Sequence, residues 1–271
     1  MKLEIIKNLS RYQEIVEKYR RKGCISNDYL YAEVADLVLK ECLFECCQKD
    51  NAFLFLRKDK CWRVYYYLND LSELFSFDEQ ENFVTEIIYR GNSGVSDSEM
   101  NYLVKCGFKP HLTRHLYCGI YNDLLISANT DFVVRKAISL DEVHMACELF
   151  NATFDPYSGD YIPDAMIPRL FADGDIWIAT DEENHFAGAL HQTIDHGVSW
   201  VSHVAVSLAF RGRGIGRALL DAFVEFNHVD EKCRFMLWVQ ANNEPAVRMY
   251  QNKGFKYVNK SSLSMLITKK I

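Results

Sequence analysis

Arg211-Gly212-Arg213-Gly214-Ile215-Gly216-Arg217 is a glycine-rich stretch between a strand-like run at Trp200–Leu208 and a helix-like run at Ala218–Asn227. Its three glycines permit positive φ and let bare backbone N–H groups approach a ligand. The following helix N-terminus adds partial positive charge, and three arginines add countercharges for phosphate. The spacing fits neither the P-loop nor the dinucleotide fingerprint. The stretch therefore predicts a site for a phosphorylated ligand, with a simple tight turn as the alternative.

A second motif begins at Asn243 and reads Asn-Glu-Pro-Ala-Val-Arg-Met-Tyr-Gln-Asn-Lys-Gly-Phe. Asn243 suits a helix N-cap, Pro245 the first turn, and Gly254 the C-terminal end. At about 100° per residue, Asn243, Ala246 and Tyr250 fall on one face of this helix. That face presents an amide, a gap and a phenol to a ligand, unless Tyr250 only packs half into the core.

Together the two stretches form Arg-x-x-Gly-x-Gly followed by Asn-x-x-Ala-x-x-x-Tyr-x-x-x-Gly-Phe. The sequence resembles the GNAT superfamily of acyl-CoA N-acyltransferases, and the resemblance covers residues 131 to 268. It implies that acyl-CoA, here most simply acetyl-CoA, binds along the loop, the preceding strand and the second helix. The cofactor-binding residues implied are Val204, Val206, Arg211, Gly212, Arg213, Gly214, Ile215, Gly216, Arg217, Asn243, Ala246 and Tyr250.

The resemblance also implies direct attack of an amine on the thioester. Backbone groups of Val204 and Val206 would pair with the pantetheine arm, and one N–H there would polarise the thioester carbonyl. Tyr250 would protonate the departing thiolate, Ala246 would leave space for the arm, and Asn243 would hydrogen-bond it. An amine with a pKa of about 10 must lose a proton before attack, so a base or a water chain is needed.

The base is not fixed by the resemblance. Relatives with a base on this strand usually carry Glu or His on the cofactor-facing side, where strict alternation puts Trp200 and Ser202, together with Val204 and Val206. His203 is the catalytic candidate, but with Val201, Ala205 and Ser207 it faces away unless a β-bulge intervenes. It is otherwise a packed core histidine. His191, on the preceding strand, and a water chain are the alternatives.

Composition narrows the function class. The 271 residues carry 31 Lys and Arg against 37 Asp and Glu, a formal net charge of −6, which argues against a nucleic-acid partner. No apolar signal segment or run of 18 apolar residues is visible, and the nine cysteines are irregularly spaced, so we expect a cytoplasmic protein without a membrane partner. The cluster Cys42, Cys46 and Cys47 lacks zinc spacing, so we expect buried structural thiols and no metal.

The first half repeats the order of the second. Helices are expected at Ile6–Arg21, Tyr31–Cys47 and Ser96–Cys106, and strands at Asn51–Leu56, Cys61–Leu68, Asn82–Tyr89 and Leu112–Ile120. Gly107-Phe108 matches Gly254-Phe255, but Gly94 precedes Gly107 by 13 positions whereas Arg211 precedes Gly254 by 43. Ser96, Glu99 and Leu103 stand where the second half has Asn243, Ala246 and Tyr250. The first half is thus expected to bind no acyl-CoA.

The second half is expected to begin after a connection at residues 121–131. It would contain a strand at Phe132–Ala137, a helix capped by Ser139 and Glu142, and a short helix at Ala165–Ala172, followed by strands at Ile176–Thr180 and Phe186–Thr193. The segment Phe154–Pro163 either contacts the acceptor, through Tyr157, Tyr161 and Pro163, or only fills a lid.

The fold class expected is α+β, with two tandem GNAT-like domains, each a mixed, mostly antiparallel sheet flanked by helices. Residues 1–125 would form a degenerate domain and residues 131–271 the N-acetyltransferase domain. The expected function is transfer of an acetyl group from acetyl-CoA to a primary amine of a small molecule or peptide. A non-catalytic acyl-CoA sensor or partner-binding module is the alternative, and the acceptor and oligomeric state are left open.

Overall fold

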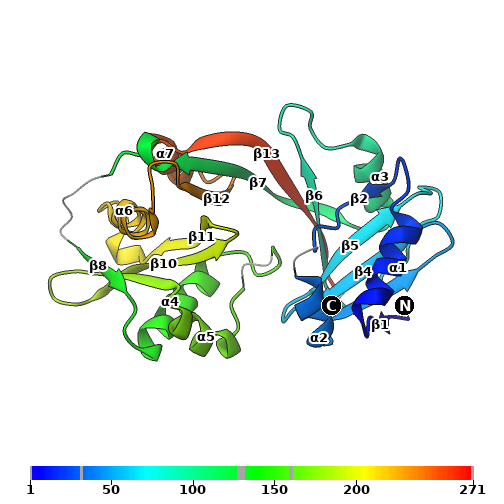
Figure 1. Ribbon diagram of the computed structural model, residues 1–271, viewed down its shortest axis with the longest axis horizontal. Helices are drawn as coiled ribbons and strands as arrows, with labels where there is room; N and C mark the ends of the chain where they lie inside the picture. Colours follow the sequence, from blue (N-terminus) through cyan, green and yellow to red (C-terminus); the bar gives the residue numbers. More distant parts are fainter. Residues whose placement is uncertain (1, 31–32, 127–131, 159–160, 270–271) are drawn as a thin grey trace. The chain divides into compact units, whose positions relative to one another are not determined.

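The computed structural model describes residues 2–30, 33–126, 132–158 and 161–269. The chain divides into two compact units, unit 1 with Met1–Thr113 and Ser261–Ile271 and unit 2 with Arg114–Lys260 (Figure 1). The fold is α+β, with a mixed sheet and, over the described residues, seven α-helices. None of the helices in those ranges is both long enough and apolar enough to span a bilayer.

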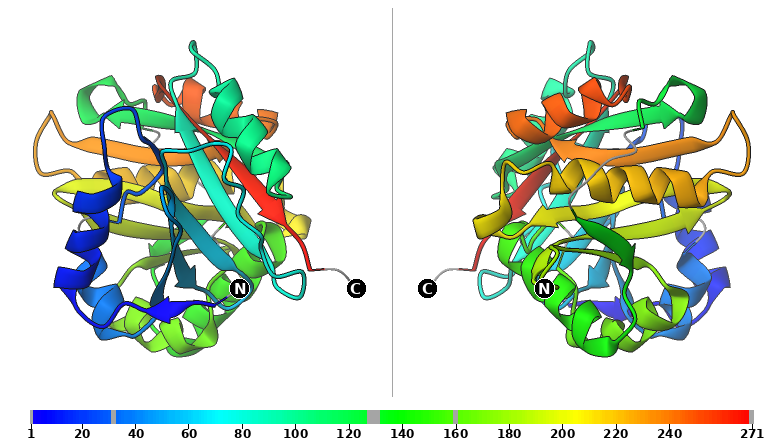
Figure 2. Two further views of the ribbon diagram at one scale, coloured as in Figure 1. Left: turned by 90° about the vertical axis from the view of Figure 1, so that its right-hand side faces the viewer. Right: turned by 90° about the vertical axis from the view of Figure 1, so that its left-hand side faces the viewer.

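Unit 1 is a sheet with helices on both faces. Its strands β1 (Glu4–Ile5), β3 (Leu43–Cys47), β4 (Ala52–Arg57), β5 (Trp62–Leu68) and β6 (Phe83–Tyr89) are neighbours in that order, and β2 (Ile25–Ser26) pairs with β5. Because side chains alternate, Leu54 and Leu56 of β4 face α1 (Leu9–Tyr19) and α2 (Val34–Leu39), while Phe53 and Phe55 face α3 (Asp97–Lys105). Figure 2 shows α1 and α3 on opposite sides of the strands.

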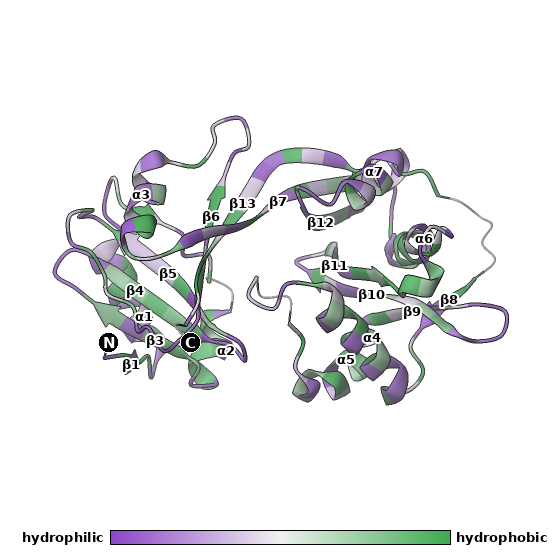
Figure 3. Cartoon of the chain, turned by 180° about the vertical axis from the view of Figure 1, so that it is seen from behind, coloured by the Kyte–Doolittle hydropathy of each residue, from purple (hydrophilic) through white to green (hydrophobic). Residues whose placement is uncertain are grey.

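Unit 2 has the same layering. Its strands β8 (Val133–Lys136), β9 (Ile176–Thr180), β10 (Phe186–Asp195), β11 (Val198–Val206) and β12 (Arg234–Gln240) are neighbours in chain order, and only β11 and β12 pair in parallel. One core lies under α6 (Ile215–Asn227) and α7 (Glu244–Asn252), and the other under α4 (Leu140–Thr153) and α5 (Ile167–Asp173). The apolar residues, green in Figure 3, concentrate on central strands such as β4 and β11.

Each unit is completed by a strand from the other half of the chain. β7 (Lys109–Ile120) leaves unit 1 after Thr113, and its residues Arg114–Ile120 pair antiparallel with β12 of unit 2. Conversely, residues Ser261–Ile267 of β13 (Lys256–Ile267) pair antiparallel with β6 of unit 1. The compact units therefore do not coincide with the expected segments 1–125 and 131–271, because each unit exchanges one strand with the other.

Most expected elements are present, but the expected helix Tyr31–Cys47 is wrong over its second part. Helix α2 ends at Leu39, and Leu43–Cys47 forms β3, paired along its length with β4. Cys46 and Cys47 therefore point to opposite faces of a strand. The expectation of buried thiols is wrong here, because Cys42 and Cys46 are half-buried and Cys47 is exposed. All nine cysteines are free thiols. Tyr31 and residues 127–131 of the expected connection lie outside the described residues.

In unit 2 the parallel strands β11 and β12 leave an opening where they stop pairing. In unit 1 the corresponding space between β5 and β6 is filled by side chains of unit 1 itself. β5 and β6 pair only at Trp62–Arg63 with Phe83–Val84. Beyond that point Asn27 bridges the strands, since its amide donates to the carbonyls of Val64 (3.3 Å) and Glu86 (3.0 Å) and accepts from the Tyr66 amide (2.8 Å). The Tyr66 hydroxyl donates to Glu99 at 2.6 Å. This packing is a physical reason for the expectation that the first half binds no acyl-CoA.

Candidate active site

The glycine-rich loop is built from two left-handed residues. Gly212 has φ +80° and Gly214, the N-cap of α6, has φ +85°, a region where side chains with a Cβ are strained. Gly216 differs from the expectation because its φ is not positive, and a Cβ there would lie 3.3 Å from the Met249 sulfur. The first helical amide bonded to a carbonyl is that of Ala218, to Gly214 at 3.0 Å. The preceding amides of the helix are thus left for a ligand.

The three arginines of this loop are exposed. The Arg211 Nε donates to the Val206 carbonyl at 3.3 Å, and the Arg213 guanidinium lies 5.0 Å from the ring centroid of Phe132. None of the three is ion-paired with a carboxylate of the described chain. Their charges, next to the amides at the start of α6, suit a phosphorylated ligand.

Strand β11 keeps an open edge beside this loop. It pairs with β12 only over Ser199–Val201, and from there to Val206 it stays paired with β10 while its edge toward β12 is open. The Ser207 amide donates to Ala187 of β10, so in an antiparallel ladder the backbone groups of Val204 and Val206 face the other way, toward the open side. The Val206 carbonyl is partly used by Arg211. The residues present therefore fit an extended polar chain such as a pantetheine arm.

A β-bulge changes the faces of β11. His191 pairs with His203, but Gln192 pairs with Val201, so Ser202 is the extra residue. Val201 consequently packs in the core under α6, on the side of Val204 and Val206, while His203 faces α4. The expected grouping by strict alternation, with Val201 beside His203 and Trp200 beside Val204, is therefore wrong. A bulge is present, but it moves Val201 and Trp200, and His203 still lies on the face opposite Val204 and Val206, as strict alternation predicts.

Helix α7 supplies the other wall. The Asn243 Oδ1 caps the helix by accepting from the Ala246 amide at 3.2 Å, and its NH₂ group is left to donate to a ligand. Tyr250 is 6% exposed, and burial raises the pKa of its phenol well above the usual range. Its hydroxyl takes part in no hydrogen bond within the described part of the chain. Asn243, Ala246 and Tyr250 line one pocket of about 410 Å³ together with Val204, His191 and His203.

His191 and His203 form a cross-strand pair in that pocket. Their Nδ1 atoms are 3.0 Å apart, the rings are nearly parallel at 8°, and each residue is 7% exposed. Burial, and then the neighbouring His203, lowers the pKa of His191 to about 3, so its ring stays neutral. The His203 ring also stacks on Phe150 and meets the edge of Phe154. The contact between the two Nδ1 atoms holds the rings in fixed positions relative to each other.

Several residues that line the pocket lie outside the two sequence motifs and are not predicted by them. Trp238 and Gln240 come from β12, Arg114 from the exchanged part of β7, and Phe154 from the end of α4. Trp238 could have been found from the alternation of β12, because Phe235, Leu237 and Val239 are buried and Trp238 points to the opposite face. Arg114 could not, since it reaches unit 2 only through the strand exchange. Tyr157, Tyr161 and Pro163 do not line this pocket, and residues 159–160 between them lie outside the described ranges.

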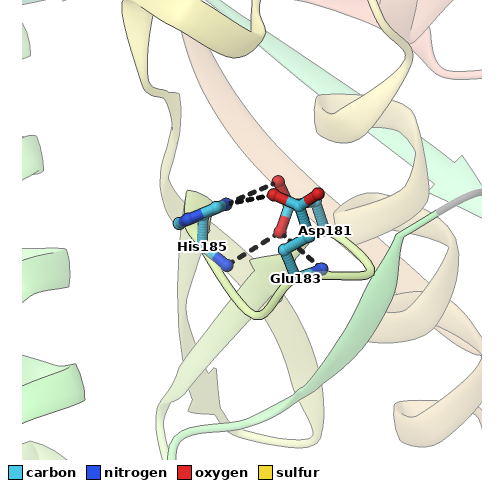
Figure 4. Close-up of side chains that lie close together, drawn as sticks. All are labelled: Asp181, Glu183 and His185. Carbon is cyan, nitrogen blue, oxygen red and sulfur yellow. Dashed lines mark hydrogen bonds and ion pairs between the residues drawn. The ribbon is translucent and has the colours of Figure 1, made fainter.

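One group of side chains in the described part of the chain has the composition of a metal site. Asp181, Glu183 and His185 lie in the turn between β9 and β10, with their ligand atoms within 4.8 Å of one another (Figure 4). The turn itself explains them, because Asp181 accepts from the amides of Glu183 (3.1 Å) and His185 (2.8 Å) and contacts the His185 ring at 3.1 Å. Glu183 and His185 are exposed, so no metal is assigned here.

Comparison with known proteins agrees with this geometry. Residues 143–255 match the model of the acetyltransferase (GNAT) family. Streptothricin acetyltransferase of Escherichia coli is 26% identical over 140 residues, which are 48% of this chain and 73% of that protein.

Solved structures show the same fold. A GCN5-related N-acetyltransferase from Sphaerobacter thermophilus has a TM-score of 0.59 at 15% identity, covering 82% of this chain and 77% of that one. A tandem GNAT protein from the clavulanic acid biosynthesis pathway has a TM-score of 0.58 at 13% identity, covering 100% and 99%. The segment matched by the family contains the loop, β11, β12 and α7 that surround the pocket, so the second half of this chain is a GNAT acetyltransferase domain in a tandem GNAT fold.

Proposed function

We propose that unit 2 transfers an acetyl group from acetyl-CoA directly to the primary amine of a small-molecule or peptide acceptor. The observation that carries the proposal is the single pocket that holds Tyr250, His203 and the open edge of β11. Acetyl-CoA would supply an acyl group already activated as a thioester, so no protein nucleophile is required.

The donor would be held by three elements. The loop from Arg211 to Arg217 offers arginines and the first amides of α6 to the phosphates. The outward backbone groups of Val204 and Val206 offer hydrogen bonds to the pantetheine arm, with Ala246 leaving room and the Asn243 NH₂ group donating. A β11 amide is available to polarise the acyl carbonyl.

Two side chains would move protons. His203 accepts the proton that the amine must lose, and neutral His191, 3.0 Å away, holds the His203 ring in place. Because burial raises the pKa of Tyr250, its phenol stays protonated at neutral pH and can donate to the departing sulfur. The acid, Tyr250 of α7, and the base, His203 of β11, therefore come from different elements but line the same pocket.

The test is a panel of primary amines incubated with acetyl-CoA, with release of free thiol followed over time. Tyr250→Phe, which removes the proton donor and little packing, is the matched variant. We expect thiol release that depends on both an amine and Tyr250. If no amine in a broad panel supports release while CoA still binds, the domain is a sensor and the proposed reaction is wrong.

A further inference from the structure

Two of the four tryptophans lack the partners that the other two have. The Trp62 ring lies 5.3 Å from Phe44, and the Trp177 Nε1 donates to Gln192 at 2.8 Å. Trp200 and Trp238 belong to none of the core clusters, although both are half-buried. Over the described ranges neither ring has a hydrogen bond or a contact with another ring or a cation. A large apolar ring left without packing at a pocket is a mark of a binding surface.

The two rings lie on the same face of neighbouring strands. Val201 and Leu237 pack in the core under α6 and α7, so the adjacent Trp200 and Trp238 point to the opposite face of the sheet. Because β11 and β12 pair in parallel at Trp200 and Met236, Trp238 lies two residues further along the neighbouring strand. Both line the pocket that holds His203 and Tyr250.

The rest of the pocket combines apolar side chains with uncharged polar ones and favours an occupant that brings no further charges; the uncharged polar residues are Thr153, Thr193, Ser202, Gln240 and Asn243. Phe154, Val204 and Tyr250 add apolar surface, and His191 is neutral because its pKa is lowered to about 3. Arg114 is the one side chain with a full charge among the described residues of the lining, and its charge is positive. No described carboxylate lines the pocket, so a polyamine would bring extra positive charges to a surface without countercharges. A volume of about 410 Å³, shared with the pantetheine arm, restricts the acceptor to a small molecule or to one exposed side chain or terminus.

We propose that Trp200 and Trp238 bind the body of the acceptor, and that the acceptor is a small primary amine carrying a flat aromatic ring. This rests on the proposed acetyl transfer for its chemistry, but the binding surface is tested separately. The rings would pack against the acceptor's ring and attract its amine, which arrives as an ammonium ion, before His203 takes its proton.

Activity is measured with primary amines that differ in the group that carries the amine. The kcat/KM for 2-phenylethylamine is compared with those for 2-cyclohexylethylamine, propylamine and putrescine. Offset or edge contacts between rings lead us to expect a preference of about threefold to tenfold for the flat ring over the saturated one. In Trp200→Ala and Trp238→Ala the ratio of 2-phenylethylamine to propylamine should fall toward one. In Trp62→Phe, a control change at a tryptophan of unit 1 that does not line the pocket, the ratio should stay that of the parent.

Binding is measured without turnover, by titrating the CoA-loaded chain with each amine and following tryptophan fluorescence. We expect 2-phenylethylamine to change the emission of the parent and of Trp62→Phe, and to have no effect on Trp200→Phe/Trp238→Phe, whose CoA affinity shows that it is folded. A signal without thiol release from any amine would refute acetyl transfer and leave the aromatic acceptor site standing. Equal binding of 2-phenylethylamine and putrescine, or a signal that survives in the double variant, would overturn the site.

Discussion

Gly254→Ala should destabilise unit 2 far more than an otherwise similar glycine substitution. Gly254 has φ +99°, and a Cβ there would lie 2.3 Å from the Asp123 carbonyl oxygen and 3.2 Å from its carbon. The left-handed conformation costs an alanine roughly 1–2 kcal/mol, and displacing the Asp123–Leu124 backbone costs roughly a further 1–3 kcal/mol. The total, roughly 2–5 kcal/mol, is a large part of the stability of a domain.

Gly174→Ala is the matched control, because Gly174 also follows a helix of unit 2, with φ +65°, but has no atom within 4 Å of its would-be Cβ. It should cost only the conformational part, roughly 1–2 kcal/mol. The assay is urea unfolding followed by tryptophan fluorescence, which mainly reports unit 2 because Trp177, Trp200 and Trp238 all lie there. If the two variants unfold within about 0.5 kcal/mol of each other, the close packing of the connecting segment against Gly254 is wrong.

Three further predictions concern the site. Tyr250→Phe should keep its affinity for CoA while turnover on a confirmed amine falls by about 10²-fold, provided that thiolate protonation limits the rate; unchanged turnover removes the acid role from Tyr250. His191→Gln should make the free energy of unfolding depend less on pH in the acid range. The folded pKa of His191 is about 3, so as the pH falls the unfolded chain binds this proton first and the folded state loses stability. Between pH 6.5 and pH 5.0, urea unfolding should show that the parent loses roughly 1.5 kcal/mol more than the variant. Equal losses would show that His191 titrates normally. Calorimetry should find one CoA site per chain, and a second site would contradict the filling of unit 1 by Asn27 and Glu99.

The local backbone conformation of the two motifs could be predicted from the sequence, because it depends on residues that are neighbours in the chain. Gly214 takes the positive φ expected of it, and Asn243 caps its helix through the Ala246 amide. Gly216 is different: its lack of a Cβ matters for the approach of Met249, a contact between two helices that no local pattern encodes.

Features that depend on pairing between strands could not be predicted in the same way. The bulge at Ser202 is a mismatch between β10 and β11, so alternation within β11 alone puts Val201 on the side of His203 and Trp200 on the side of Val204, the reverse of what the structure has. The cysteine stretch at Leu43–Cys47 has helical spacing, but pairing with β4 makes it a strand. Arg114 lines the pocket because β7 pairs with β12, more than a hundred residues away in sequence.

Direct transfer of an acetyl group from acetyl-CoA to an amine in the pocket of unit 2 is the proposed reaction. The most direct measurement incubates the chain with acetyl-CoA and 2-phenylethylamine, or whichever amine the panel identifies, and quantifies free CoA and N-acetylated amine by mass spectrometry. We expect equal amounts of both products, no acetyl group left on the protein, and neither product from Gly214→Val, whose strained φ disrupts the loop at the start of α6. Free CoA without N-acetylated amine, or full activity in Gly214→Val, would contradict it.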